Sequence, residues 1–343
     1  MLKLSRDLGI DLGTANILVY AEGKGVVLRE PSVVAIDKNT GKVLQVGAAA
    51  RNMLGRTPGN VVAVRPLREG VISDYEMTEK MLSQFLKKII RYSLVKPRVV
   101  VCVPSGVTEV EERAVIDAAM EAGARRVYLI EEPFAAALGA GLDLSAPNGR
   151  MVVDIGGGTT DIAVLSVNNI ATSSSIKIAG DTFDDMIITH MRRHHGLLIG
   201  ANTAEEVKIT IGCVTERPEE VSMTVKGRDL RTGLPREALV SSTELLETLR
   251  RPAWRIVDEI LSVMELSSPE LVSDVAQNGI ILTGGGSQIY GMDKLIQERT
   301  EIQCLIADNA ESCVALGCGK SLQWINSMQE GTINIARRKL MQE

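Results

Sequence analysis

Two short segments combine an aspartate with glycine and hydroxyl side chains, a composition suited to binding phosphate and a metal ion. They read Asp11-Leu-Gly-Thr-Ala-Asn16 and Asp154-Ile-Gly-Gly-Gly-Thr-Thr-Asp161. Glycine lets the backbone approach an anion closely and direct several N–H groups at it. Mg²⁺ prefers oxygen ligands, keeps several waters and needs few carboxylates. We therefore expect Asp11 and Asp154 to flank a hydrated Mg²⁺ beside a polyphosphate.

The two segments form a domain-sized internal repeat. Each starts in an apolar, strand-like run and leads through the aspartate and the glycines into a second such run, at residues 17–20 and 162–167. This implies two related domains that face each other and hold one polyphosphate between two glycine hairpins. The residues expected to form these hairpins are Gly13, Thr14, Ala15 and Asn16 in one half, and Gly156, Gly157, Gly158 and Thr159 in the other.

A third glycine cluster, made of Gly284, Gly285, Gly286 and Ser287, follows an apolar strand at residues 279–282. Its backbone could lie flat against an adenine or a ribose, although any tight strand-to-helix turn has a similar composition. Two other nucleotide motifs are excluded. The P-loop pattern that would end at Gly319-Lys-Ser has Val314 in place of its first glycine, and no Gly-x-Gly-x-x-Gly fingerprint is complete.

Hydrolysis of a nucleotide requires a water molecule held in line with the γ-phosphate. Glu131 and Glu132 end a strand-like run just before Pro133, where a carboxylate could orient or deprotonate that water. A carboxylate in the same place could equally cap the helix that follows, and the residues alone leave both interpretations open. The histidines at positions 190, 194 and 195 show no metal-binding pattern with acidic partners, so we interpret them as part of a solvated helix face.

Strand-like and helix-like segments alternate along the chain, which predicts an α/β fold with mainly parallel sheets. Helices are expected at residues 77–92, 109–122, 133–141, 190–198, 204–211 and 311–326. The repeat and two interruptions of the alternation divide the chain into a large and a small subdomain in each half. The predicted boundaries are 1–31 and 66–145 with 312–343 for subdomain IA, 32–65 for IB, 146–181 and 244–311 for IIA, and 182–243 for IIB.

Composition limits the classes of function. The chain has 343 residues, of which 45% are hydrophobic and 24% charged, as in a globular protein with two large domains. The net charge of −5 provides no basic excess for phosphates, so we expect no nucleic acid partner. The five cysteines include no CxxC pair and are expected to be reduced. We also expect no signal peptide and no membrane-spanning helix.

Taken together, the motifs resemble those of the actin, sugar kinase and heat-shock chaperone superfamily. The two aspartate segments resemble its phosphate motifs, and Leu282-Thr-Gly-Gly-Gly-Ser287 resembles its adenosine motif. Further segments resemble the MreB family of bacterial actin-like cell-shape proteins over nearly the whole chain. These are Glu30-Pro-Ser-Val-Val-Ala-Ile36, Lys96-Pro-Arg98, Ile130-Glu-Glu-Pro-Phe-Ala-Ala-Ala137 and Thr232-Gly-Leu-Pro-Arg236.

The resemblance implies an actin-like, ribonuclease-H-like duplicated ATPase fold, with ATP and Mg²⁺ between its two domains. It implies that Glu131 activates the attacking water, with Asp11, Asp154 and Thr160 beside the γ-phosphate. By the same resemblance, residues of a helix in the second small subdomain contact the nucleoside. These are Glu205, Glu206 and Lys208.

The resemblance also implies a partner and a location. It predicts a slow ATPase, primarily structural, that forms antiparallel double protofilaments at the inner face of the cell membrane and works with cell-wall elongation proteins. Leu94 and Val95 occupy the place of the family's lipid-inserting loop, although the residues alone favour a lead-in to the strand at Val99. A sugar-kinase-like phosphotransferase and a chaperone-type ATPase are the alternatives within the superfamily.

Overall fold

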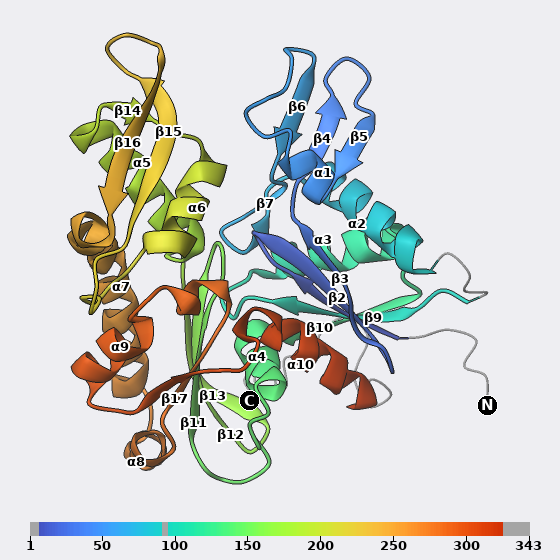
Figure 1. The fold of residues 1–343 in the computed structure, drawn as a ribbon. Coiled ribbons are helices and arrows are strands. Elements are labelled where there is room, and N and C mark those ends of the chain that lie inside the picture. The colour runs from blue at the N-terminus through green and yellow to red at the C-terminus, as the bar shows by residue number, and fades with distance from the viewer. Residues whose placement is uncertain (1–6, 91–94, 325–343) are drawn as a thin grey trace.

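The computed structural model describes residues 7–90 and 95–324, and two five-stranded sheets form its centre (Figure 1). The first sheet has the strand order β10-β9-β1-β2-β3 and the second has the order β13-β12-β11-β17-β18. The first consists of β1 (Leu8–Leu12), β2 (Asn16–Ala21), β3 (Gly25–Pro31), β9 (Arg98–Val103) and β10 (Arg126–Glu131). The second consists of β11 (Arg150–Ile155), β12 (Thr160–Ser166), β13 (Asn169–Ile176), β17 (Ile280–Thr283) and β18 (Cys304–Ile306).

The two sheets have the same topology. In each, three consecutive strands form an antiparallel meander, and two later strands add in parallel beside the first of them. This duplication confirms the predicted actin-like α/β fold and makes β1 equivalent to β11. The expectation of mainly parallel sheets was wrong, because strands joined by a tight turn return antiparallel and only those joined through helices run parallel.

Helices cover the sheets and also fill the space between them. In the first half, α2 (Tyr75–Ile90) packs against α3 (Glu109–Glu121), which begins with a capping box between Thr108 and Glu111. Between the sheets, α4 (Glu132–Gly139) packs closely against α10 (Cys313–Ser321). Buried residues of both sheets join these two helices in one hydrophobic core, including Val100, Val152 and Leu165. The C-terminal helix α10 thus lies against β1 of the first half.

Helices α7 (Ser242–Glu265), α8 (Pro269–Asn278) and α9 (Met292–Thr300) belong to the second half. Helix α7 contacts β12, β13 and α9, and its buried face belongs to the main core of this half. Short 3₁₀ turns η1 (Gly285–Gln288) and η2 (Ala310–Ser312) follow β17 and β18, and η3 (Leu322–Trp324) follows α10. Among the described residues, none of the helices is both long and apolar enough to span a bilayer.

Each half carries a smaller sheet, and both small sheets lie at the same end of the molecule (Figure 1). The first contains β4 (Val34–Asp37), β5 (Val43–Val46) and β6 (Val61–Val64), with α1 (Ala48–Arg51). The second contains β14 (Leu197–Leu198), β15 (Ser222–Asp229) and β16 (Pro235–Ser241), with α5 (Gly180–His194) and α6 (Ala201–Ile211). A hairpin of β7 (Leu67–Arg68) and β8 (Val71–Ile72) completes the first half.

The helix predicted at residues 190–198 was placed wrongly. Helix α5 begins ten residues earlier, at Gly180, and ends at His194. Gly196 then takes a left-handed conformation with φ of 58°, which terminates helices. Leu197 and Leu198 pair with Asp229 and Arg228 as strand β14 instead.

Candidate functional site

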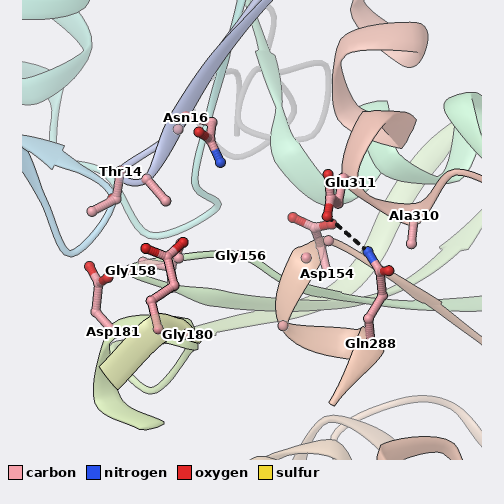
Figure 2. Close-up of a pocket in the computed structure, with 18 of the residues that line it drawn as sticks. Thr14, Asn16, Asp154, Gly156, Gly158, Gly180, Asp181, Gln288, Ala310 and Glu311 are labelled. Atoms are coloured by element: carbon pink, nitrogen blue, oxygen red, sulfur yellow. Dashed lines mark hydrogen bonds between the residues drawn. The ribbon is translucent and has the colours of Figure 1, made fainter. Parts of the chain in front are cut away.

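A cavity of about 440 Å³ lies between the two halves, and both contribute to its walls. The first half provides the β1–β2 turn, Arg29, Arg65 and Gly70. The second half provides the β11–β12 turn, the start of α5, part of α6 and the turns after β17 and β18. Figure 2 shows Thr14 and Asn16 on one side of this cavity and Gly156, Gly158 and Asp181 across from them.

The β1–β2 turn is held from behind by neighbouring segments of the first half. Ser32 donates from its hydroxyl to the carbonyl of Gly13 at 2.6 Å, and its backbone N–H donates to the carbonyl of Ala15 at 3.0 Å. The backbone N–H of Gly70, in the β7–β8 hairpin, donates to the hydroxyl of Thr14 at 2.9 Å. The turn is therefore preorganised rather than a free loop.

The β11–β12 turn is held in an equivalent way by the start of α5. Backbone N–H groups of Gly180 and Asp181 donate to the carbonyls of Gly156 at 3.1 Å and Gly157 at 2.8 Å. Within the turn, the N–H of Gly156 donates to the carbonyl of Thr159 at 2.9 Å. The positive end of the α5 dipole thus points toward the cavity, where it favours a bound anion.

The two turns meet face to face across the cavity. A Cβ atom added at Gly157 would lie 2.6 Å from the Cβ of Ala15, and one added at Gly158 would lie 2.5 Å from the hydroxyl oxygen of Thr14. Contacts this short mean that neither glycine can be replaced by a larger residue unless the opposite turn moves. The approach leaves the backbone of both halves next to the same space, as the predicted two-sided phosphate cradle requires.

Acidic side chains gather beneath the two turns, at the ends of β1, β10 and β11. Burial raises the pKa of both Asp11 and Asp154 from 3.8 to about 7. Hydrogen bonds to Asp11 from the Cys102 thiol and to Asp154 from Thr283, the latter at 2.6 Å, oppose this rise. The pKa of Glu132 is also raised well above its usual value by burial and by the negative charges of nearby carboxylates.

This cluster suits a divalent cation. Each buried carboxylate disfavours ionisation of the others, and a positive charge among them removes that penalty. The donors are all oxygens, and the neighbouring turns leave space for phosphate, which is the environment Mg²⁺ prefers. Asp11 and Asp154, from equivalent strands, are the residues that would hold it.

The third glycine cluster borders the other end of the cavity. Gly284 has a φ of 79°, and a Cβ atom there would lie 2.2 Å from the carbonyl oxygen of Ile155. The cluster therefore packs against the end of β11, next to the β11–β12 turn. Gln288 donates to Glu311 at 3.2 Å (Figure 2), and Glu311 also forms an ion pair with Arg29 of the first half.

The remaining wall comes from α6. Lys208 is held between the carbonyl of Gly180, at 3.0 Å, and the carboxylate of Asp184, at 2.9 Å. Burial raises the pKa of Asp184 to about 6, and the charge of Lys208 limits this rise. Glu205 forms an ion pair with Arg51 of the first small subdomain. Lys208 thus fixes the start of α5, while Glu205 links the lining of the cavity to the first half through Arg51.

The cavity brings together most of the residues that the sequence singled out. Its lining includes Asp11, Gly13, Thr14, Ala15, Asn16, Asp154, Gly156, Gly157, Gly158, Thr159, Glu205, Lys208, Gly284, Gly285 and Gly286. The predicted site residues that are not among the lining residues are Glu131, Thr160, Glu206 and Ser287.

Those four residues have other environments, and Glu131 is partly exposed at the end of β10. Thr160 donates its hydroxyl to the carbonyl of Ile178 at 2.6 Å, and Ser287 donates to the carbonyl of Gly284 at 2.7 Å, so both are turned inward. Glu206 is exposed on α6. Of the two adjacent glutamates, it is Glu132 whose side chain is buried at the cavity wall, where Cys102 lies 3.9 Å away.

Several lining residues escaped the sequence analysis. Arg65 and Asp181 form a 2.8 Å ion pair that joins the two halves beside the two glycine turns. A glycine at the start of a helix, as in Ala179-Gly180-Asp181, is the only sequence signal for this part of the site. Arg29 and Glu311 carry no such signal, because they meet from distant parts of the chain.

The interpretation of the histidines as a solvated helix face holds for His194, which is exposed on α5, but was wrong for His190 and His195. His190 is buried in the last turns of α5, and its Nε2 lies 2.7 Å from Oε1 of Glu244 on α7. The Nε2 of His195 lies 2.5 Å from the same oxygen. The acidic partner is more than forty residues away in the sequence, which is why the local pattern did not reveal it.

Comparisons with known proteins place this geometry in a family. The family model described as MreB/Mbl protein matches residues 5–330. The cell shape-determining protein Mbl of Bacillus cereus is 51% identical over 94% of this chain and 98% of its own length. The cell shape-determining protein MreB of Escherichia coli is 49% identical over 94% of both chains.

A solved structure gives the same result for the fold. MreB5 of Spiroplasma citri bound to ADP superimposes with a TM-score of 0.90 at 39% identity, and covers 94% of this chain and 97% of that protein. The same protein bound to AMPPNP gives a TM-score of 0.88. The duplicated sheets, the paired glycine turns and these similarities together show that the chain belongs to the MreB/Mbl family of actin-like proteins.

Proposed function

We propose that the chain binds ATP with Mg²⁺ in the cavity between its two halves. The observation that carries this proposal is the pair of facing glycine turns above the carboxylates of Asp11 and Asp154. The turns supply backbone N–H groups for the phosphates, and the Gly284 cluster provides a flat backbone surface for the nucleoside. The related MreB5 of Spiroplasma citri has been solved with ADP and with AMPPNP, which supports the same type of ligand here.

Slow hydrolysis of ATP is part of this proposal. A buried carboxylate at the wall next to the phosphate turns can orient a water molecule for attack on the γ-phosphate. The position of Glu132 supports that residue, rather than Glu131, in this role. Thr160, whose hydroxyl is bonded to Ile178, would act by shaping the second turn.

We further propose that ATP promotes assembly of the chain into filaments that determine cell shape by organising cell-wall synthesis. The support is the similarity over nearly the full length to proteins named cell shape-determining. The proposal also includes assembly into antiparallel double protofilaments and recruitment of cell-wall elongation proteins. Both of these parts rest on the resemblance of the motifs to the family.

The test of this function is polymer formation. Purified protein should sediment and show filaments by electron microscopy with Mg-ATP or Mg-AMPPNP, and should not do so with EDTA. A soluble chain that hydrolyses ATP only when a sugar is added would instead support a phosphotransferase. ATP-dependent release of an unfolded polypeptide, without filaments, would support a chaperone-type ATPase.

Attachment of the filaments to the cytoplasmic face of the membrane is a separate proposal. It rests on the position of Leu94 and Val95, which matches that of the lipid-inserting loop in the family. Leu94 lies outside the residues that the structure describes, as do residues 325–343. The change of both residues to Asp should reduce sedimentation with anionic liposomes while leaving filament formation in solution unchanged. Equal sedimentation of both proteins would exclude this loop as the anchor.

A further inference from the structure

A second cluster of ionisable side chains lies away from the nucleotide cavity, where the end of α5 meets the start of α7. His190 comes from the last turns of α5, His195 follows its end, and Glu244 stands in the first turn of α7. Their nearest atoms are Nε2 of both imidazoles and one carboxylate oxygen, all within 4.8 Å of one another. None of these three residues lines the nucleotide cavity.

We propose that this cluster, the His190–His195–Glu244 site, binds a zinc ion. Two imidazole nitrogens and one carboxylate form a common protein ligand set for Zn²⁺, with water as the fourth ligand. Zinc lies about 2.0–2.2 Å from such ligands, so two of them stand about 3.3 Å apart in a tetrahedral site. The observed separations of 2.7 and 2.5 Å from Glu244 Oε1 require the ligand atoms to move apart by less than about 1 Å.

The surroundings of His190 support its role as a ligand. Its second ring nitrogen, Nδ1, lies 3.0 Å from the hydroxyl of Thr248, one turn beyond Glu244 on α7. When Nδ1–H donates a hydrogen bond to Thr248, the lone pair of Nε2 would be available to an ion bound beside Glu244. Imidazoles that bind metals characteristically form such a second hydrogen bond, which fixes the tautomer and the ring orientation.

The accessibility and charge of the cluster also suit an ion. His190 is buried, whereas His195 and Glu244 are partly exposed, so an ion can enter and keep a water ligand. The nearby cation Arg236, which donates to the carbonyl of His195, is paired with Asp229 at 2.7 Å.

A bound ion would join two parts of the second half. The start of α5 is hydrogen-bonded to the β11–β12 turn, while His190 lies in its last turns and His195 follows its end. Helix α7 belongs to the core of the larger sheet. Zinc would therefore fix the end of α5 to that core, and we expect it to raise the melting temperature of the protein.

The experiment is a titration of the full chain with Co²⁺, followed by displacement with Zn²⁺, in excess Mg²⁺ to occupy the carboxylates of the nucleotide cavity. We expect one tetrahedral Co²⁺ absorption spectrum per chain that Zn²⁺ abolishes, and a rise in melting temperature with Zn²⁺. The changes His195→Gln and Glu244→Gln should each weaken Zn²⁺ binding at least tenfold and remove that rise. Glu244→Gln preserves the size of the side chain and one acceptor oxygen, which guards against misfolding.

His194→Gln is the matched control. The imidazole ring of His194 stacks on that of His190 with centroids 4.4 Å apart, but His194 contributes no atom to the ligand set. This variant should bind Zn²⁺ like the wild type. The proposal fails if the wild type shows no tetrahedral Co²⁺ spectrum, or if His195→Gln and Glu244→Gln bind Zn²⁺ as well as His194→Gln does. In either case the cluster is only a hydrogen-bonded joint between α5 and α7.

Discussion

Thr14 and Gly158 belong to different halves of the molecule, yet the hydroxyl oxygen of Thr14 lies only 2.5 Å from the place that a Cβ atom at residue 158 would take. The same hydroxyl accepts a hydrogen bond from the backbone of Gly70. Thr14 therefore cannot yield easily to a larger residue opposite it, and the separation of the two halves is set at this point.

The change Gly158→Ala should accordingly impair nucleotide binding. The added methyl group would push the two turns apart, and we expect the affinity for Mg-ATP to fall at least about tenfold, which corresponds to about 1.4 kcal/mol. Isothermal titration calorimetry measures this directly. Gly59→Ala is the control, because a Cβ atom at Gly59 meets no atom within 4 Å. Equal loss of affinity in both variants would contradict the steric explanation.

Replacement of the two adjacent glutamates should separate their roles. Glu132→Gln is expected to slow phosphate release by about 100-fold or more while ATP still binds, because the amide cannot accept a proton from the attacking water. Glu131→Gln should remain within a few-fold of the wild type, since Glu131 is not among the cavity-lining residues. Single-turnover measurements with bound ATP distinguish the two. The reverse outcome would restore Glu131 to the role that the family resemblance implies.

The stability of the nucleotide-free protein should depend on pH in a characteristic way. The pKa values of Asp11 and Asp154 are about 7 in the folded protein, whereas an aspartate outside the folded structure has the ordinary value of 3.8. Between these values the folded state binds more protons than the unfolded state, so the free energy of unfolding falls as pH rises from about 4 to about 7. Each group contributes a slope of at most about 1.4 kcal/mol per pH unit.

Denaturant titrations from pH 4.5 to 8 measure that slope. Asp154→Asn should flatten it, because the amide does not titrate. Added Mg²⁺ should stabilise the protein more at pH 8, where the carboxylates are ionised, than at pH 5. A stabilisation by Mg²⁺ of the same size at both pH values would argue against these carboxylates as its ligands.

The change Lys208→Met should destabilise the second half. It removes the cation that faces Asp184 within a poorly exposed ion pair, and loss of one partner of such a pair costs about 3 kcal/mol or more. The loss should be smaller at pH 5 than at pH 8, because the pKa of Asp184 is already raised to about 6 and rises further without Lys208. Thermal unfolding at both pH values tests this. The double change Lys208→Met with Asp184→Asn should recover much of the stability, and no recovery would show that packing by Lys208 dominates.

The sequence predicted the parts of the site that are local in the chain. The strand, aspartate and glycine turn around Asp11 occurs again around Asp154, and both turns line the cavity as expected. These features depend only on short-range rules, namely the apolar strand that ends at a carboxylate and the glycines that let a backbone turn tightly. The repeat itself predicted the duplicated sheets.

Side-chain direction was beyond the reach of the sequence. Glu131 ends β10 and Glu132 begins α4, so the change from strand to helix geometry between two adjacent residues decides which of them lines the cavity. The pattern of charges is the same for both. Likewise, Ser287 fits the adenosine motif, but its hydroxyl bonds to Gly284 inside the turn.

The sequence by itself thus determined the fold class, the two glycine turns and the carboxylates beside them, because each depends on neighbouring residues. Only the tertiary structure decided which glutamate reaches the cavity, which ion pairs join the halves, and that His190 and His195 meet Glu244. These pairings arise where separate helices and sheets pack together. Their partners lie too far apart in the chain for any local pattern to connect them.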